Sequence, residues 1–356
     1  MQLSRPLWII LAIACALIVL AANTINSSTT TTAAFARARS TYHQGSDLSG
    51  APDVVKTVVP SSSLLAFVGV FTAIKSDRRQ ALRSTWFPSS ETELLRVEDD
   101  LKIRLRFVVG HLQDPADQAA VEEEQRVHND FLVVNVQETY DNLVLKVYTF
   151  FQDVQATYNP AYIIKTDDDL YTRPDRIAQA IPQWQARGSG YIGAMRVGTE
   201  AHDMKESPWY EPLGILHSHR YYMYASGCMY ALSREAAQLV TGVPFSQRRL
   251  AGGGEDASVG LWVLGYNIPY LDDRRICMGL TDDGSCPDNF LVATAGCNGL
   301  CDPVETVPRL HQDPNCTKTD TGDLVLMESG YDFGPVGCVK VDDDGNVNKT
   351  SCFELE

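Results

Sequence analysis

The sequence is poor in basic residues. Its 356 residues include 30 Lys and Arg against 45 Asp and Glu, which gives a formal net charge of −15 at pH 7. No basic stripe is present that could neutralise phosphate groups, and this argues against nucleic acid as a partner. The sequence also lacks Cys-x-x-Cys pairs, which disfavours a structural zinc site. The cysteines of this acidic protein therefore need another explanation.

Charged residues are also absent from Leu7–Ala22, which follows Arg5. This apolar run is slightly short for an ordinary bilayer but suits the thinner membranes of the early secretory pathway. A signal peptide cleaved near Ala21 is the alternative. Because a stem-like segment follows, we expect an uncleaved transmembrane anchor at 7–22 behind a cytoplasmic tail at 1–6. Everything after residue 23 is then lumenal or extracellular.

The rest of the chain divides into three predicted regions. Residues 23–62 are rich in Ser, Thr and Ala, and such a segment buries too little apolar surface to fold, so we expect an extended stem. Residues 63–280 are expected to form the main folded domain, and 281–356 a cysteine-rich region after it.

Cysteine usage agrees with export. Of nine cysteines, Cys15 lies in the apolar segment, and seven of the other eight follow residue 276. An even number in an oxidising compartment indicates disulfide bonds, although about 105 pairings of eight cysteines are possible. Two Asn-x-Thr sequences, at Asn315 and Asn348, predict N-glycosylation.

From residue 64 the sequence alternates two kinds of pattern. Runs of β-branched and aromatic residues predict strands, and apolar residues at three- and four-residue spacing predict helices. Strands are expected at 64–72, 103–109, 131–136, 162–166, 191–194 and 225–232, and helices at 77–86, 118–127, 142–158 and 255–264. This alternation predicts an α/β fold in which helices cover both faces of a mostly parallel sheet.

The strand expected at Tyr162–Thr166 runs directly into Asp167, Asp168 and Asp169. Folding does not require three carboxylates at the end of a buried strand, whereas hard divalent cations bind carboxylate oxygens and retain phosphate ligands. In open α/β sheets, ligands bind just beyond the carboxyl ends of the strands. The pattern therefore predicts a metal–nucleotide site, with an acidic turn as the alternative.

A second acidic pair, Glu255 and Asp256, follows three glycines at the start of an expected helix. Negative side chains suit the positive end of the helix dipole, so capping explains the pair as well as catalysis does.

Five segments in a fixed order resemble the β-1,3-galactosyltransferase family, which also includes β-1,3-N-acetylglucosaminyltransferases and, more distantly, Fringe proteins. The segments are Arg78–Trp86, Asp130–Lys146, Lys165–Asp169, Ala225–Ser233 and Glu255–Gly260. Each match is weak alone, but their shared order, with the anchor and stem before them, makes the resemblance specific. The sequence departs from the family pattern at Glu138, which replaces an Asp, and at Met229, which replaces a Gly. Tyr222 and Met223 stand where Pro-Pro is common, so the acceptor stays open.

The resemblance implies a GT-A-like nucleotide-diphospho-sugar transferase fold and an inverting, Mn²⁺-dependent reaction. The donor would be a UDP-sugar, with galactose favoured over N-acetylglucosamine, and the acceptor a glycan or glycoprotein that gains a β-1,3 linkage. The protein would be a single-pass type II protein of the Golgi membrane with its catalytic domain in the lumen.

The resemblance also implies roles for individual residues. Asp256 would be the base that deprotonates the acceptor, with Glu255 as the fallback. Asp169 would bind Mn²⁺ while Asp167 assists or holds the ribose, and His311, in a His-Gln-x-Pro segment similar to that of plant members, would be a third ligand.

Further candidates contact the two substrates. Those on the nucleotide-sugar side, besides Asp167, are Asp168, Lys165, Arg79, Arg83 and Lys146. The two arginines and Lys146 could meet phosphates or brace carboxylates equally well. Those on the acceptor side are Trp209, Tyr224, Ser226 and Gly227.

Two other functions compete with the transferase. One is a catalytically inactive lumenal sugar-binding module on the same fold, against which intact Asp167, Asp169 and Asp256 count. The other is a metal-dependent phosphoesterase, which would need a second cluster of carboxylates and histidine that the sequence does not show.

Overall fold

A computed structural model describes most of the chain after the predicted stem. It covers residues 64–207, 209–211, 219–252, 254–295, 299–319 and 324–328, and the backbone of 338–341 and 347–350. The predicted tail, anchor and stem lie outside these residues. Among the residues that are covered, no helix is both long and apolar enough to span a membrane.

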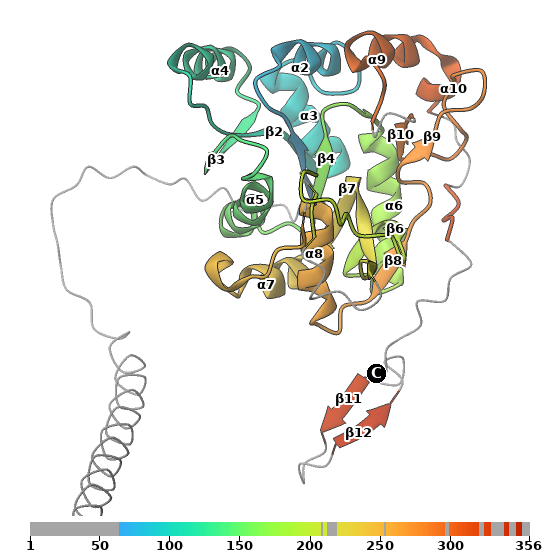
Figure 1. Cartoon of the computed structure of the whole chain (residues 1–356). Coiled ribbons are helices and arrows are strands. Elements are labelled where there is room, and N and C mark those ends of the chain that lie inside the picture. Colours follow the sequence, from blue (N-terminus) through green and yellow to red (C-terminus); the bar gives the residue numbers. More distant parts are fainter. Residues whose placement is uncertain are drawn as a thin grey trace, which may run out of the picture. The chain divides into compact units, whose positions relative to one another are not determined.

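A seven-stranded mixed sheet forms the centre of the fold (Figure 1). Its strands lie in the order β3-β2-β1-β4-β7-β6-β8, and β7 runs antiparallel to both neighbours while the other pairs are parallel. The strands are β1 Ala66–Phe71, β2 Ile103–His111, β3 Phe131–Gln137, β4 Tyr162–Asp167, β6 Tyr191–Arg196, β7 Tyr224–Ser233 and β8 Tyr270–Asp272. The predicted mixed α/β fold with a mostly parallel sheet is confirmed.

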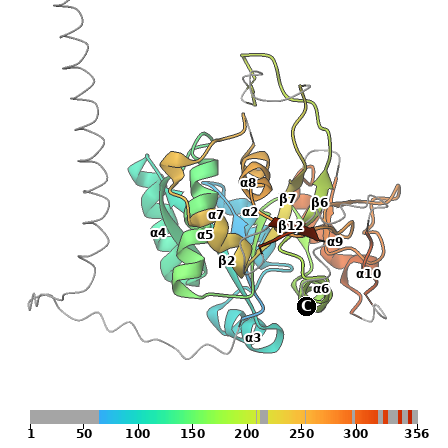
Figure 2. The same ribbon diagram turned by 90° about the horizontal axis from the view of Figure 1, so that it is seen from below.

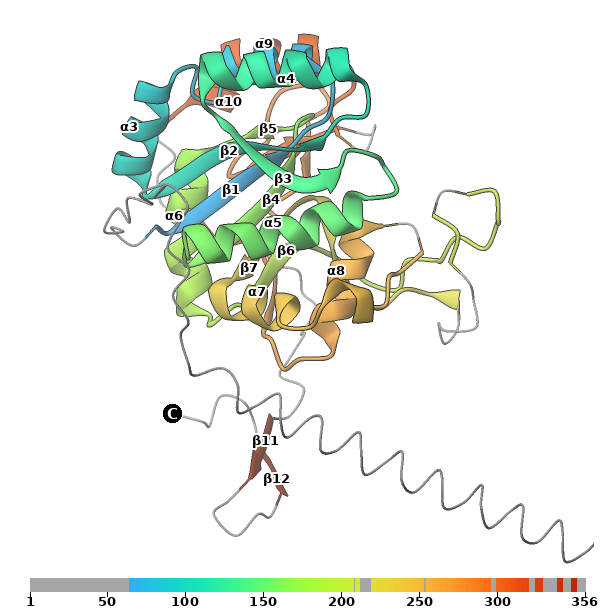
Figure 3. The same ribbon diagram turned by 90° about the vertical axis from the view of Figure 1, so that its left-hand side faces the viewer.

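Helices cover both faces of this sheet (Figure 3). On one face α5, α7 and α8 bury side chains such as Phe151 and Trp262, and on the other α2, α3 and α6 bury Leu82 and Trp184. The helices are α2 Ser76–Arg83, α3 Glu91–Leu101, α4 Pro115–His128, α5 Leu143–Thr157, α6 Pro174–Ala186, α7 Arg234–Thr241, α8 Glu255–Leu264, α9 Pro303–Gln312 and α10 Pro314–Thr317, with a 3-10 turn at Phe245–Gln247. The connection between β6 and β7 extends away from the sheet (Figure 2).

Close packing of α5 on β1 depends on Gly69. A Cβ atom at this position would lie 2.5 Å from the ring of Phe150 and 2.8 Å from Val108. The missing side chain therefore lets the helix approach the centre of the sheet.

The described residues after 280 contribute to the same core as the sheet. Phe290, Leu291 and Leu310 are fully buried together with residues of β1 and β4. A small sheet joins this region to the rest, because β10 (Val292–Thr294) pairs with β5 (Tyr171–Thr172) and β9 (Met278–Gly279). Described residues on both sides of position 280 therefore share one core, and the boundary expected there stays a prediction.

Disulfide bonds link Cys228 to Cys277 and Cys286 to Cys316, as the cysteine content predicted. Farther along the chain, β11 (Cys338–Val341) and β12 (Val347–Thr350) pair as an antiparallel hairpin, and β12 contains Asn348.

Candidate active site

Three elements meet at the end of the sheet where strand β4 finishes. The acidic triplet follows β4, and because β7 is antiparallel to β4, the beginning of β7 lies beside it, with Thr166 opposite Met229. Helix α8 packs against β7 and begins with Glu255 and Asp256. The topology thus brings together the two acidic groups that the sequence singled out.

Lys165 lies at the centre of this arrangement. Its ammonium group is buried and donates hydrogen bonds to Asp167 Oδ1 at 2.7 Å, Glu255 Oε1 at 2.6 Å and the carbonyl oxygen of Gly227 at 2.6 Å. Burial alone would lower the pKa of Lys165, but the two carboxylates outweigh it and raise that pKa. Lys165 therefore stays charged and joins the end of β4 to the start of α8.

Asp256 is held by backbone groups. Its Oδ2 accepts a hydrogen bond from the N–H of Gly227 at 2.9 Å, and its Oδ1 accepts one from the N–H of Ala257 at 2.7 Å. The carboxylate remains partly exposed, and its burial on the remaining sides raises its pKa. Gly227 thus accepts from Lys165 through its carbonyl and donates to Asp256 through its N–H, which fixes the orientation of this carboxylate.

Glu255 differs from its neighbour. Its side chain is buried, with one oxygen bonded to Lys165 and the other accepting the hydroxyl of Tyr230 at 2.7 Å. Burial raises its pKa despite the attraction of Lys165. A carboxylate enclosed in this way supports the arrangement of the site, whereas Asp256 is accessible to a substrate.

The acidic triplet is unevenly paired. Asp168 accepts hydrogen bonds from Thr72 Oγ1 and from Arg78 Nη1, both at 2.8 Å, whereas the carboxylate of Asp169 has a longer 3.5 Å contact with Arg78. Among the residues that the structure describes, none hydrogen-bonds to the buried Oδ1 of Asp169. Burial and the neighbouring carboxylates raise the pKa of Asp169 to about 6, and burial likewise raises that of Asp167 to about 6.

These observations fit a divalent cation. A buried carboxylate oxygen without a partner and excess negative charge are what a hard cation would compensate. The backbone also closes on this oxygen, since a Cβ at Gly299 would lie 2.6 Å from the Asp169 carboxyl. Among the described residues, however, no group of three or more His, Cys, Asp or Glu is arranged to hold a metal ion. Protein groups would therefore supply only part of the ligands, with phosphates supplying others.

Comparison with known proteins agrees with this geometry. Residues 77–274 match the galactosyltransferase family model, a span that contains the triplet and the start of α8. The chain belongs to the galactosyltransferase family. It is similar to probable beta-1,3-galactosyltransferase 12 of Arabidopsis thaliana, with 35% identity over 266 residues that cover 74% of this chain and 70% of the relative. Probable beta-1,3-galactosyltransferase 13 of the same plant is 30% identical over 271 residues, which cover 75% and 77%. The predicted family is confirmed, and the chain is a glycosyltransferase.

In this galactosyltransferase-family protein, three predicted phosphate-binding residues brace carboxylates instead. Arg79 binds Glu124 at 2.6 Å, Arg83 binds both Glu124 and Asp130, and Lys146 binds Glu138 at 2.7 Å. All three side chains are buried. Of the two roles that the sequence left open, contact with phosphates or bracing of carboxylates, the structure therefore favours bracing.

Arg78 is the residue that the sequence analysis missed. It precedes Arg79, and successive residues on a helix point in different directions, so Arg78 faces the acidic triplet while Arg79 and Arg83 share another face. Arg79 and Arg83 are four residues apart and therefore share a helix face, whereas Arg78 does not fit this spacing. This pattern could have revealed the difference.

His311 is not brought into one metal-ligand group with the aspartates. It lies on α9, and its Nδ1 is 2.9 Å from the hydroxyl of Tyr171. Partial burial, together with the nearby charge of Arg173, lowers its pKa. The structure thus gives His311 a hydrogen-bond partner of its own.

The acceptor-side candidates divide into two groups. Tyr224, Ser226 and Gly227 lie at the beginning of β7, beside Asp256. Trp209 lies in the long β6–β7 connection, 40% exposed, and donates from Nε1 to the hydroxyl of Tyr140 at 2.7 Å. Sequence reasoning did not foresee Tyr140, because this contact joins segments far apart in the chain.

Proposed function

We propose that the protein transfers galactose from UDP-galactose to a hydroxyl group of a glycan or glycoprotein, forming a β-1,3 linkage with inversion in a Mn²⁺-dependent reaction. The names of its Arabidopsis relatives, both probable beta-1,3-galactosyltransferases, favour galactose over N-acetylglucosamine. The observation that carries the proposal is the geometry of Asp256. Both of its oxygens are oriented by backbone N–H groups, and the carboxylate stays partly exposed at the edge where substrates bind.

Asp256 would act as the general base. As the acceptor oxygen forms its bond to C1 of galactose, the hydroxyl proton passes to Asp256, and the bond from C1 to the UDP oxygen breaks with its electron pair leaving on UDP. A single displacement of this kind inverts the configuration at C1. Burial raises the pKa of Asp256, which makes its ionised form a stronger base than an ordinary aspartate.

The other carboxylates would serve the donor. Asp169, with Asp167 beside it, would hold Mn²⁺, and the bound cation supplies neutralisation of charge on the diphosphate. Asp168 is anchored by Thr72 and Arg78 and would keep the loop in place. Lys165 holds Asp167 and the Gly227 peptide in fixed positions before substrates arrive.

Release of UDP by the full chain, purified in detergent, tests this function. A panel of UDP-sugars is offered with Mn²⁺ or with EDTA, together with a glycan array as the source of acceptors. We expect Mn²⁺-dependent transfer with UDP-galactose, reduced by on the order of 10²–10⁴-fold in Asp256→Asn. Asp99→Asn, an exposed aspartate on α3, is the matched control and should keep full activity.

Other outcomes discriminate between the alternatives. Transfer from UDP-N-acetylglucosamine alone would correct the donor. Mn²⁺-dependent binding of UDP without release from any donor, on any glycan, would contradict the enzyme and favour the sugar-binding module.

The location in the Golgi membrane, as a type II protein held by the apolar segment at 7–22, belongs to the same proposal. The Cys228–Cys277 and Cys286–Cys316 bonds support passage through an oxidising compartment. N-glycans at Asn315 and Asn348 would report a lumenal domain, and a mobility shift after endoglycosidase treatment is the corresponding test.

A further inference from the structure

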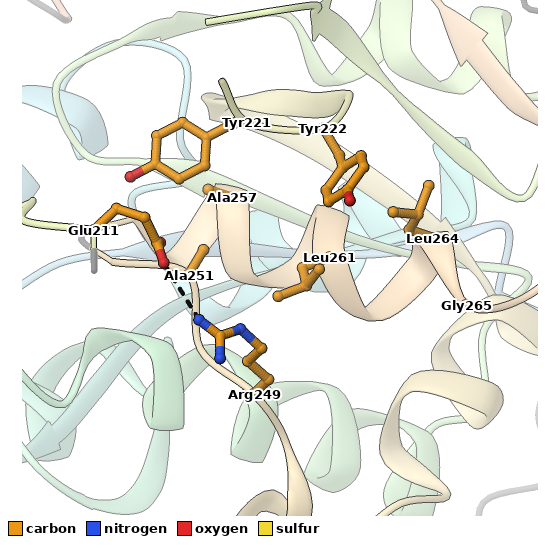
Figure 4. Close-up of a pocket in the computed structure, with 9 residues that line it drawn as sticks. All are labelled: Glu211, Tyr221, Tyr222, Arg249, Ala251, Ala257, Leu261, Leu264 and Gly265. Carbon is orange, nitrogen blue, oxygen red and sulfur yellow. Dashed lines mark hydrogen bonds and ion pairs between the residues drawn. The ribbon is translucent and has the colours of Figure 1, made fainter. Parts of the chain in front are cut away.

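A pocket of about 430 Å³ opens along α8 (Figure 4). Small-molecule sites typically occupy on the order of 300–1,000 Å³. One lining residue, Ala257, directly follows the proposed base Asp256. The pocket therefore lies along the helix that carries the proposed base, and none of its lining residues is assigned to the donor.

One part of the pocket is apolar. Leu261 and Leu264 lie on the same face of α8 as Ala257, and Tyr222 lies across from them (Figure 4). The side chain of Tyr222 is 48% exposed and Leu264 is 42% exposed. An aromatic ring and aliphatic groups facing one another suit a ligand with an apolar face.

The other part of the pocket is polar and fixed in place. The buried carboxylate of Glu211 accepts a hydrogen bond from the N–H of Gly252 and contacts Arg249 Nη2 at 3.3 Å. The hydroxyl of Tyr221 donates to the carbonyl of Gly252 at 2.7 Å. These contacts hold polar groups next to the segment that leads into Asp256, where the half-exposed guanidinium of Arg249 can donate to ligand oxygens.

The length of the pocket indicates how much ligand it can take. With a rise of 1.5 Å per residue, Ala257 and Leu264 lie about 10 Å apart along the helix. This is longer than one pyranose ring. A sugar whose hydroxyl reaches Asp256 would leave room along α8 for the unit attached to it.

We propose that this pocket binds the second sugar of the acceptor, the residue on the reducing side of the one that receives galactose. A pyranose has an apolar C–H face that would pack on Tyr222 and Leu264, and hydroxyl groups that would meet Arg249 and Glu211. The inference rests on the proposed transferase function and adds that the acceptor is at least a disaccharide unit.

The experiment uses the two shortest acceptors of one glycan series from the array, the second extended by one sugar at its reducing end. The ratio of kcat/KM for the extended acceptor to that for the short one is measured in the full chain. We expect the ratio to be about tenfold or more in the wild type and to fall by about tenfold in Tyr222→Ala and in Leu264→Ala. Leu95→Ala, an exposed leucine on α3, should leave it unchanged.

Several results would overturn the inference. One is a wild-type ratio near one, and another is a ratio that survives both substitutions while thermal unfolding shows intact folds. An array on which no glycan is labelled also contradicts it. In that case, Mn²⁺-dependent UDP release in the absence of acceptor separates failure of this inference from failure of the transferase itself, because release needs only the donor site.

Discussion

The ammonium group of Lys165 is shared by two carboxylates, Asp167 from β4 and Glu255 from α8. Lys165 and Glu255 lie where water has little access, whereas the side chain of Asp167 is 35% exposed, so Glu255 in particular cannot replace this partner with solvent. The same ammonium group binds the Gly227 carbonyl, and through that residue it supports the proposed base. A single buried cation therefore determines the arrangement of both halves of the site.

Replacing Lys165 with Met should expose this dependence. The substitution leaves the buried carboxylate of Glu255, and the partly exposed one of Asp167, without their cation, and we expect the free energy of unfolding to fall by about 3–5 kcal/mol. Denaturant-induced unfolding measures it, with Lys102→Met as the control, because Lys102 forms an exposed pair with Asp99 that contributes about 0–1 kcal/mol. A loss below about 1 kcal/mol for Lys165→Met would contradict the conclusion that this buried cation determines the arrangement of the site.

A pH-dependent effect is expected at Asp153 on α5. Burial raises the pKa of this carboxyl above its ordinary value, so the folded protein favours the protonated form. The contribution of Asp153 to stability is then present at low pH and is lost as the pH rises through its raised pKa. We expect Asp153→Asn to gain stability relative to the wild type between pH 4 and pH 7, as measured by urea unfolding. If the difference in stability between Asp153→Asn and the wild type stays constant with pH, the predicted upward shift of the Asp153 pKa is contradicted.

At the scale of elements, strands buried on both faces were the easiest to predict. The continuous apolar runs of β1 and β4 and the regular spacing in α5 place these elements to within two residues. Helix α3 was not predicted, although Ser90 accepts a hydrogen bond from the N–H of Glu93 in the manner of a capping box. Helix α6 contains Pro182, which weakens the helical pattern.

Contacts between distant segments could not be predicted from local patterns. Strand β5 has two residues, and it pairs with β10 from a remote part of the chain. The same holds for the candidate site. The sequence identified the acidic residues, but the pairing of Lys165 with Glu255 depends on how β4 and α8 pack. The sequence around a charged residue does not show which distant residue it will pair with.

The approach of α5 to β1 leads to a prediction for Gly69→Ala. The added methyl group would collide with Phe150 and Val108, and we expect the free energy of unfolding to fall by about 1–3 kcal/mol. Gly279→Ala, at a position with open space around it, is the matched control. Thermal unfolding compares the two variants, and equal midpoints would show that the helix can move away at little cost.

At the scale of the whole molecule, the residues after 280 complete the site. The N–H of Leu300 donates to the carbonyl of Asp169 at 2.7 Å, and Gly299 lies against the carboxyl group of the same residue. The family match ends at residue 274, so these contacts come from a part of the chain outside it. A protein truncated at residue 280 would lack one wall of the acidic triplet.

The Cys286–Cys316 bond closes a loop within this region. Removing it in a Cys286→Ala, Cys316→Ala double variant should lower the free energy of unfolding by about 2–4 kcal/mol, because the unfolded chain gains conformational freedom. Denaturant unfolding under oxidising conditions measures the change. Treating the wild type with a reductant should produce a loss at least as large, because the Cys228–Cys277 bond is then broken as well. A double variant as stable as the oxidised wild type would contradict the expectation.

The Cys228–Cys277 disulfide bond begins one residue after Gly227. Gly227 binds Lys165 through its carbonyl and Asp256 through its N–H, so this covalent link lies beside the proposed catalytic residues. Biosynthesis in a reducing cytosol would leave that position untethered. Recombinant material made there should be judged by its thiol content before its activity is interpreted, and hosts that oxidise nascent chains are the appropriate source of enzyme.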